Sequence, residues 1–166
     1  MDFLLRPWKR SDIESLLKYA NNYRIAKNLT DMFPYPYTKK AGRRFIKMAC
    51  SSCPTNIFAI EVNNEAVGSI GLYILNDVRR LNAEIGYWLA EPFWGKNIMT
   101  EAVKQMVEYG FNTFNINRIY ASTFGDNMAS RRVLEKAGFK MEAYFEKAFV
   151  KNEILHDEAV YAIRRY

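Results

Sequence analysis

The chain has 166 residues, of which 49% are hydrophobic and 15% aromatic, and it carries a formal net charge of +6. A chain of this length and composition can bury one sizeable core, so we expect a single globular domain over residues 1–166. No apolar run is long enough to span a bilayer, and the opening MDFLLRPWKRSD is unlike a secretory signal. These features favour a cytoplasmic protein with no membrane partner.

The charge excess comes from 24 Lys and Arg residues against 18 Asp and Glu residues, which favours an anionic ligand or partner. The basic residues are spread over several segments, and each group can also be a solvated helix face or loop. Cys50 and Cys53 have the spacing of a metal or redox pair. Because the chain has no second pair and its single histidine, His156, is distant in sequence, we predict no metal site.

The first third of the chain predicts a strand followed by two helices. Residues 3–7 form a short apolar strand, and Ser11 and Glu14 have the spacing of a capping box at the start of a helix. The segment 21–37 is less regular and ends in FPYPY, whose prolines favour an extended aromatic loop. The pattern of residues 38–49 predicts a second helix, capped by Thr38.

From residue 56 the pattern changes to the period-two alternation of strands, with turn residues between three segments. A long amphipathic helix, a strand, a helix ending at Gly138 and two more strands follow. The predicted ranges are 56–62, 66–75, 82–90, 98–113, 118–124, 127–137, 139–150 and 158–166. This order predicts an α/β (α+β) fold with a mixed, largely antiparallel sheet of about seven strands and helices on both faces.

The turn between the third of these strands and the long helix has the features of an anion site. The first amides of a helix are unpaired and carry partial positive charge, so phosphate oxygens bind there readily. Gly95 permits close approach to the backbone, Lys96 adds a charge, and Asn97 tolerates the left-handed conformation that a nest of amides needs. A strand-turn-helix connection with one glycine is also common without any ligand.

Several segments resemble the GNAT superfamily of N-acetyltransferases, in the branch that contains the ribosomal-protein N-terminal alanine acetyltransferases. They are LLRPWKRSD, FPYPYT, AEIGYWL, FWGKNIMTEA, DNMASRRVLEKAGF and HDEAVYAI, and the resemblance covers essentially the whole chain. Two positions depart from the family pattern. Trp94 stands where the family usually has Gln or Arg, and Asn97 stands where it usually has a second Gly.

The resemblance implies that acetyl-CoA is the cosubstrate. Its pyrophosphate would bind amides from Gly95 to Met99. Its pantetheine arm would lie between two splayed central parallel strands and bond the backbone of residues 88–90. The resemblance thus assigns a cofactor-binding set of Trp88, Leu89, Ala90, Trp94, Gly95, Lys96, Asn97, Ile98, Met99, Asn127 and Ser130.

Three residues are the candidate catalytic groups. Glu84 is the expected base, because strand alternation places it on one face with Asn82 and Gly86, and a solvated or structural carboxylate is its alternative. The resemblance implies that the N–H group of Leu89 stabilises the oxyanion. Ser130 is the candidate acid, with a water molecule or a tyrosine as alternatives, because Leu134 occupies the usual tyrosine position.

The acceptor is expected to be a primary amine, by resemblance the N-terminal amine of a ribosomal protein, with Phe33, Tyr35 and Tyr37 as walls of its site. Attack would occur directly in a ternary complex. A small-amine acetyltransferase (polyamine, amino sugar or antibiotic) and a non-catalytic acetyl-CoA sensor stay open. A nucleic-acid-binding module is a third alternative, although we expect no direct nucleic-acid partner. A homodimer formed through the last strands is also left open.

Overall fold

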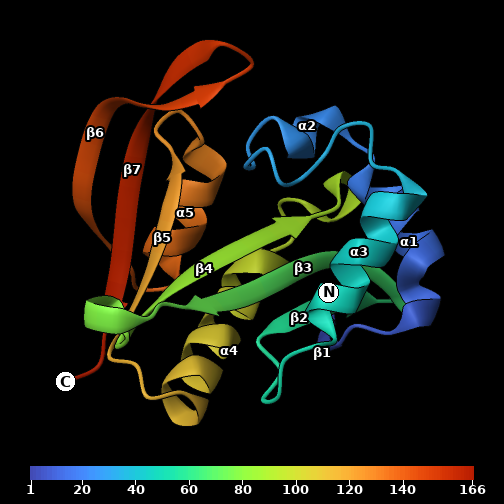
Figure 1. The fold of residues 1–166 in the computed structure, drawn as a ribbon, viewed down its shortest axis with the longest axis horizontal. Helices are drawn as coiled ribbons and strands as arrows, with labels where there is room; N and C mark the ends of the chain where they lie inside the picture. The colour runs from blue at the N-terminus through green and yellow to red at the C-terminus, as the bar shows by residue number, and fades with distance from the viewer. The chain divides into compact units, whose positions relative to one another are not determined.

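The computed structural model describes residues 1–166 and contains a seven-stranded sheet with the order β1-β2-β3-β4-β5-β7-β6 (Figure 1). Two compact units make up the chain, Met1–Gly71 with Tyr87–Ile98 and Leu72–Gly86 with Met99–Tyr166, so strands β3 and β4 belong to both. The elements are β1 (Leu4–Pro7), η1 (Arg10–Asp12), α1 (Ile13–Ala20), α2 (Tyr23–Ala26), α3 (Lys39–Ala49), β2 (Ile57–Val62), β3 (Glu65–Ile74), η2 (Asp77–Arg79), β4 (Asn82–Leu89), η3 (Glu91–Phe93), α4 (Ile98–Thr113), β5 (Arg118–Phe124), α5 (Met128–Lys136), β6 (Lys140–Lys151) and β7 (Ile154–Arg164).

The predicted order of strands and helices is confirmed, and α4 and β5 have the predicted bounds. The short α2 lies in the segment 21–37, for which the sequence predicted no helix. Strand β7 begins at Ile154 and is therefore longer than predicted. None of the helices combines the length and the apolar character that crossing a membrane requires.

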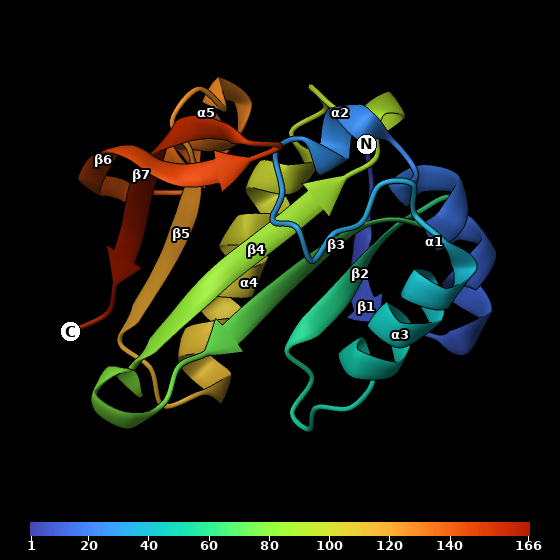
Figure 2. The same cartoon turned by 45° about the horizontal axis from the view of Figure 1, so that its top comes forward.

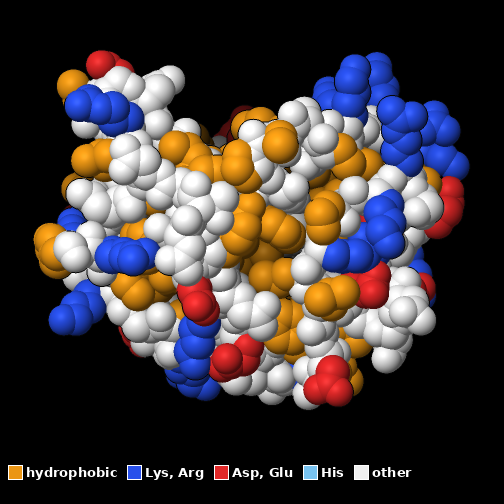
Figure 3. All heavy atoms as spheres, turned by 90° about the horizontal axis from the view of Figure 1, so that it is seen from below, with side chains coloured by type: hydrophobic (Ala, Val, Ile, Leu, Met, Phe, Trp, Pro, Cys, Tyr) orange, Lys and Arg blue, Asp and Glu red, His pale blue; other side chains and the backbone are white.

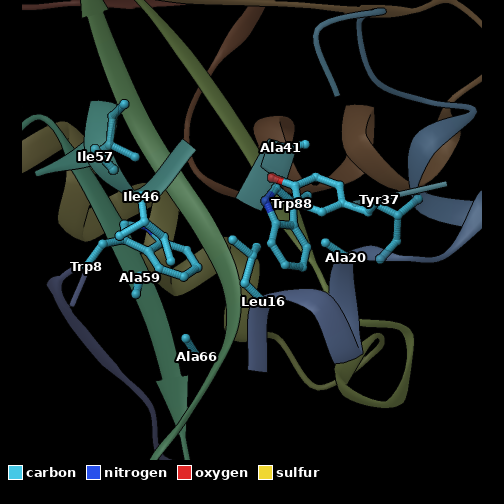
Figure 4. Packing of buried hydrophobic residues seen from close by; sticks show 12 residues of the cluster. Trp8, Leu16, Ala20, Tyr37, Ala41, Ile46, Ile57, Ala59, Ala66 and Trp88 are labelled. Atoms are coloured by element: carbon cyan, nitrogen blue, oxygen red, sulfur yellow. The ribbon is translucent and has the colours of Figure 1, made fainter. Parts of the chain in front are cut away.

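The first unit packs α1 and α3 against the strands β1 to β3. Figure 2 shows the two helices side by side. Their buried side chains form one cluster with residues of β2 and β3 and with Trp88 of β4, and Figure 4 shows Trp8, Leu16 and Ile46 within it. The side chain of Thr38 accepts a hydrogen bond from the Ala41 amide at 3.2 Å, so the predicted cap of α3 is confirmed.

A buried ion cluster fixes the start of α1. The guanidinium of Arg6 donates two hydrogen bonds of 2.8 Å to the carboxylate of Asp12, and it also forms an ion pair with Glu61. Asp12 accepts a further bond from the amide of Lys9 at 2.8 Å. The predicted capping box at Ser11 and Glu14 is therefore wrong: Asp12 is the N-cap residue of α1, and its carboxylate bonds Arg6 and the Lys9 amide rather than the first amides of the helix.

The second unit contains α4, α5 and the strands β5 to β7. Strand β7 pairs antiparallel with both β5 and β6, and Figures 1 and 2 show these three strands side by side. Side chains of α4, β5, α5 and β7 are fully buried, among them Met106, Ile119, Leu134 and Tyr161. Gly138 ends the segment that contains α5, as predicted. Its φ angle of 92° places this glycine in the left-handed region.

The parallel pairing of β4 and β5 is short. Its register joins Asn82, Ala83 and Glu84 to Arg118, Ile119 and Tyr120, although β4 continues to Leu89 and β5 to Phe124. A pairing that stops before either strand ends agrees with the predicted splaying of the central parallel strands. Glu84 is the last residue of β4 in this register.

We expect Asp12→Ala to lower the free energy of unfolding by about 3–5 kcal/mol, because the mutation leaves the buried Arg6 without its main partner. Urea unfolding would measure this loss. The matched control is Glu14→Ala, whose ion pair with Lys39 is exposed and should contribute at most about 1 kcal/mol. Equal losses in the two variants would contradict the role of the buried pair.

The contribution of Asp12 should also depend on pH. Burial raises the pKa of this carboxyl, but the hydrogen bonds from Arg6 and the Lys9 amide outweigh burial and lower the pKa below 3.8. A lowered pKa means that the stabilisation is complete above the unfolded pKa and is lost as the pH falls through the folded one. The stability difference between the wild type and Asp12→Asn should therefore shrink on acidification below about pH 4.

Candidate functional site

The loop between β4 and α4 has the backbone of an anion nest. After η3, Gly95 and Asn97 have φ angles of 72° and 61°, and α4 begins directly at Ile98. Residues with left-handed φ beside helical ones turn successive amides toward one side, which is how backbone nests bind anions. The residues Trp94 to Asn97 are exposed. Asn97 thus adopts the left-handed conformation that the sequence analysis required of it.

Trp94 has a local role that the sequence did not indicate. Its indole Nε1 donates a hydrogen bond of 2.7 Å to the carbonyl oxygen of Leu89, which closes the loop around η3. The guanidinium carbon of Arg24 lies 5.5 Å from the centre of the Trp94 ring, and Arg24 also pairs with Glu91. The departure from the family pattern therefore places an aromatic ring and an arginine beside the nest. The contact between Arg24 and Trp94 could not be predicted from the sequence, because the two residues lie 70 positions apart.

The end of β4 is held on one edge by β3. The amide of Ala90 donates to the carbonyl of Val67 at 2.8 Å. A Cβ atom at Gly68 would lie 2.5 Å from the carbonyl oxygen of Trp88, so only glycine permits this close approach. Successive amides of a strand point to opposite edges, so the N–H group of Leu89 points away from β3. That direction leaves it suited to its predicted role as an oxyanion donor.

Glu84 is a half-buried carboxylate with one weak partner. The hydroxyl of Tyr120 donates to its Oε2 at 3.4 Å. Burial raises the pKa of Glu84, and the negative charge of Glu158 raises it further, while the Tyr120 hydrogen bond lowers it less than these raise it. Tyr73 also faces Glu84, and its pKa is raised by burial and by the Glu84 charge. A carboxylate whose pKa is raised and that has two phenols as neighbours is suited to acid–base chemistry.

The predicted residues of α5 have the following places. The side chain of Asn127 accepts a hydrogen bond from the Ser130 amide at 3.2 Å, so Asn127 caps α5. Ser130 lies in the first turn and is partly buried. Leu134 is fully buried in the core, so this position offers no proton donor.

Of the three residues predicted to line the acceptor site, Phe33 and Tyr37 pack in the core and Tyr35 lies on the surface. Tyr37 is only 7% exposed, and burial raises its pKa to about 12. Phe33 packs on the same core, with its ring 5.8 Å from that of Trp88, and Figure 4 shows Tyr37 and Trp88 close together. Tyr37 therefore has a structural role, which its position in an aromatic loop did not indicate. Tyr35 is 54% exposed and stays available to a ligand.

An open pocket of about 800 Å³ lies in the first unit beside Tyr35. Tyr19 and Tyr23 add further aromatic walls, and Glu91 contributes a carboxylate that binds Asn22 at 2.9 Å. No sequence motif indicates that these residues meet, because α1 and η3 are distant along the chain. The full lining is Lys18, Tyr19, Asn21, Asn22, Tyr23, Tyr35, Ala90, Glu91 and Pro92.

The two cysteines do not belong to a group of side chains that could bind a metal ion. Cys50 and Cys53 are free and exposed, and the thiol of Cys50 contacts the carbonyl of Trp8 at 3.2 Å. No group of three or more His, Cys, Asp or Glu residues could hold a metal ion. On the face in Figure 3, Lys and Arg side chains form separate groups with Asp and Glu among them.

A family model described as an acetyltransferase (GNAT) domain matches residues 2–140. The uncharacterized N-acetyltransferase YoaA of Bacillus subtilis (strain 168) is 36% identical over 99 residues, which are 60% of this chain and 55% of that protein. The uncharacterized N-acetyltransferase p20 of Bacillus licheniformis is 31% identical over 152 residues, 87% and 84% of the two chains. Spermidine N(1)-acetyltransferase of Escherichia coli (strain K12) is 24% identical over 159 residues, 89% and 78%. The matches to YoaA and to YjcK of Bacillus subtilis span little more than half the length of those relatives.

Solved structures share the fold over nearly the whole chain. An acetyltransferase of the GNAT family from Bacillus anthracis superimposes with a TM-score of 0.84 at 25% identity, over 99% of this chain and 95% of that chain. RimL, a ribosomal L7/L12 alpha-N-protein acetyltransferase in complex with coenzyme A, gives a TM-score of 0.84 at 24% identity, over 98% and 93%. The likeness to RimL shows the fold alone.

The left-handed loop gives a stability prediction. We expect Asn97→Ala to lower the free energy of unfolding by about 1–2 kcal/mol, because a Cβ-bearing residue without a short polar side chain is strained at this φ angle. Asn97→Gly should cause no such loss, because glycine adopts positive φ freely. Urea unfolding would compare the two variants with Lys96→Ala, which should change stability by less than about 0.5 kcal/mol. An alanine variant as stable as the glycine variant would contradict the strain.

Proposed function

Because the chain belongs to the GNAT acetyltransferase family, we propose that it transfers the acetyl group of acetyl-CoA to a primary amine. The observation that carries this proposal is the exposed left-handed loop of Gly95 and Asn97, directly before a helix of 16 residues. Helix N-termini with a nest of amides bind phosphate groups. In this proposal the amides of residues 95–99 bind the pyrophosphate, and the charge of Lys96 adds attraction.

The proposal gives a part to each of the other site residues. Trp94 shapes the loop through its bond to Leu89. The backbone of Trp88, Leu89 and Ala90 is proposed to bond the pantetheine arm, although the amide of Ala90 already donates to Val67, which leaves its carbonyl for that purpose. Asn127 holds the start of α5, where it and Ser130 are proposed to meet the cofactor. Coenzyme A and acetyl-CoA are the ligands in two solved structures that share the fold.

The proposed reaction is direct attack of the amine on the thioester. Glu84, directly or through water, takes a proton from the substrate ammonium, and the neutral amine then attacks the acetyl carbonyl carbon. The Leu89 N–H group donates to the oxygen as negative charge develops there. The nitrogen, cationic after the attack, releases its second proton to water as the amide forms. When the carbon–sulfur bond breaks, the thiolate takes a proton from water or from Ser130, which then regains one from water. The amide and free coenzyme A leave, and no acyl-enzyme forms.

For the acceptor, we propose a protein N-terminal amine such as that of a ribosomal protein. The open pocket of about 800 Å³ with the exposed Tyr35 can accommodate a peptide chain. Resemblance to the branch of ribosomal-protein acetyltransferases supports the same choice. A small amine is the second candidate, because a relative over 89% of this chain is a spermidine acetyltransferase.

A calorimetric titration of acetyl-CoA, followed by thiol release with a panel of amines, tests this function. The panel contains peptides with N-terminal Ala or Ser, spermidine and an amino sugar. We expect saturable binding at one site and thiol release with at least one acceptor. Binding without release on any acceptor would support a sensor instead, and no binding would overturn the proposal. Salt-dependent binding to RNA or DNA without a response to coenzyme A would indicate a nucleic-acid module.

Glu84→Gln should lower kcat by about 10²–10⁴-fold while acetyl-CoA affinity changes little, because the amide cannot accept the ammonium proton. Thiol release and calorimetry on the same sample would measure both. Glu108→Gln on α4 is the matched control, because Glu108 is exposed and the charge change is the same. Normal turnover in Glu84→Gln would remove Glu84 from the mechanism.

The wild-type pH profile should reflect the raised pKa of Glu84. The base acts only when deprotonated, so kcat should fall as the pH drops through this pKa, at a pH above the ordinary glutamate value of 4.5. This acidic limb should disappear from the residual activity of Glu84→Gln. Its persistence there would assign the limb to another group.

A further inference from the structure

A second carboxylate lies on the same face of the sheet as Glu84. In the parallel register Glu84 is the partner of Tyr120, and side chains of paired residues share a face. Along β5, Ser122 and Phe124 share the face of Tyr120, because alternate residues point the same way. Phe124 is the partner of Glu158 on β7, so Glu158 also points to this face. The face therefore carries two carboxylates, one on either side of β5.

Glu158 is held in position by a hydrogen bond from Ser122. The hydroxyl of Ser122 donates to its Oε1 atom, and the residue is partly buried. Neither Glu158 nor Glu84 forms an ion pair with a Lys or Arg side chain. Burial is the main cause of the raised pKa of Glu84, and the negative charge of Glu158 raises it further, so the two partly buried carboxylates repel each other. A cation between them would relieve this repulsion.

The other titratable and charged groups near this face come from β3, β5, β7 and η2. Tyr73 of β3 and Tyr120 of β5 face Glu84. His156 of β7 packs edge-on against Phe124, with 5.2 Å between the ring centres. Arg118 lies over the Tyr120 ring, but its charge is shared with Glu142 of β6. Arg79 of η2 is exposed and acts weakly on Tyr120. None of these cationic groups forms an ion pair with Glu84 or Glu158.

We propose that Glu158, positioned by Ser122, binds a cationic group of the acceptor while Glu84 removes the proton of the reacting ammonium, so that this face selects cationic amines. This inference rests on the proposed function. It divides two tasks between two carboxylates in different surroundings: Glu158 is held by the Ser122 hydroxyl and binds, and Glu84, whose partner Tyr120 lies 3.4 Å away, accepts the proton.

The arrangement predicts the chemical class of the acceptor. Two carboxylates attract an amine whose neighbouring groups are neutral or positive and repel one with a carboxylate close to the amine. Diamines and peptides with a basic second residue should therefore be better acceptors than amino acids or peptides with an acidic second residue. Electrostatic selection of this kind acts mainly on acceptor binding, through KM.

The test compares steady-state kinetics of the wild type and Glu158→Gln with two matched pairs of acceptors. The pairs are 1,4-diaminobutane against 4-aminobutanoate, and Ser-Lys-Ala-Ala against Ser-Glu-Ala-Ala. In the wild type the cationic member should have the higher kcat/KM. Glu158→Gln should raise the KM of the cationic member about tenfold, the size expected for a lost charged hydrogen bond, with little change in kcat. The preference between the two members should shrink accordingly.

A second readout separates this role from a structural one. Removing the negative charge of Glu158 should lower the pKa of Glu84, so the acidic limb of kcat/KM should move to lower pH. Glu146→Gln, an exposed carboxylate on β6, is the matched control and should change neither KM nor the limb. Ser122→Ala should reproduce part of the KM increase, because it removes the positioning bond while keeping the carboxylate.

The outcomes distinguish the two proposals. A wild type that releases thiol with no amine would overturn the proposed function and this inference together. An active wild type with the same KM, preference and pH profile in Glu158→Gln would overturn this inference alone. If Glu158→Gln unfolds at a lower temperature, Glu158→Asp and Ser122→Ala supply the measurement, and a KM equal to wild type in both folded variants would also overturn it.

Discussion

The early end of the β4–β5 parallel register is the constraint on which the functional arrangement depends. Pairing stops at Glu84, so the following part of β4 does not continue this ladder with β5. Its amides are instead divided by strand alternation: that of Ala90 bonds β3, and that of Leu89 points to the other edge. A ladder continued to the end of both strands would bond the Leu89 amide to β5, and this amide could not then take its proposed role as oxyanion donor.

The regular elements could be predicted because their local signals agree with the global fold. The helix of residues 98–113 has an apolar stripe and starts after a glycine turn, and the strand of residues 118–124 alternates cleanly. The left-handed state of Asn97 was also predictable, since few residue types accept it. At these places local propensity and tertiary packing favour the same structure.

Tertiary contacts account for what the sequence did not show. Asp12 left its predicted helix-start pattern because Arg6, on β1, offers a bidentate partner in the interior. Tyr37 is buried among α1 and α3, which no periodicity in an aromatic loop reveals. Glu158 shares a face of the sheet with Glu84 only because the strand order is β4-β5-β7, although β7 is the last strand in sequence. Such residues are recognised from strand order, not from motifs.

The position of Trp94 gives the protein an internal optical signal. Of its three tryptophans, Trp8 and Trp88 are buried, at 3% and 8% exposure, whereas Trp94 is 40% exposed and lies in the loop before α4. Indole emission depends on the polarity around the ring, so the solvent-sensitive part of the fluorescence comes from this one side chain. If a ligand binds at this loop as proposed, we expect that emission to change without any label, and a stopped-flow trace would follow its binding.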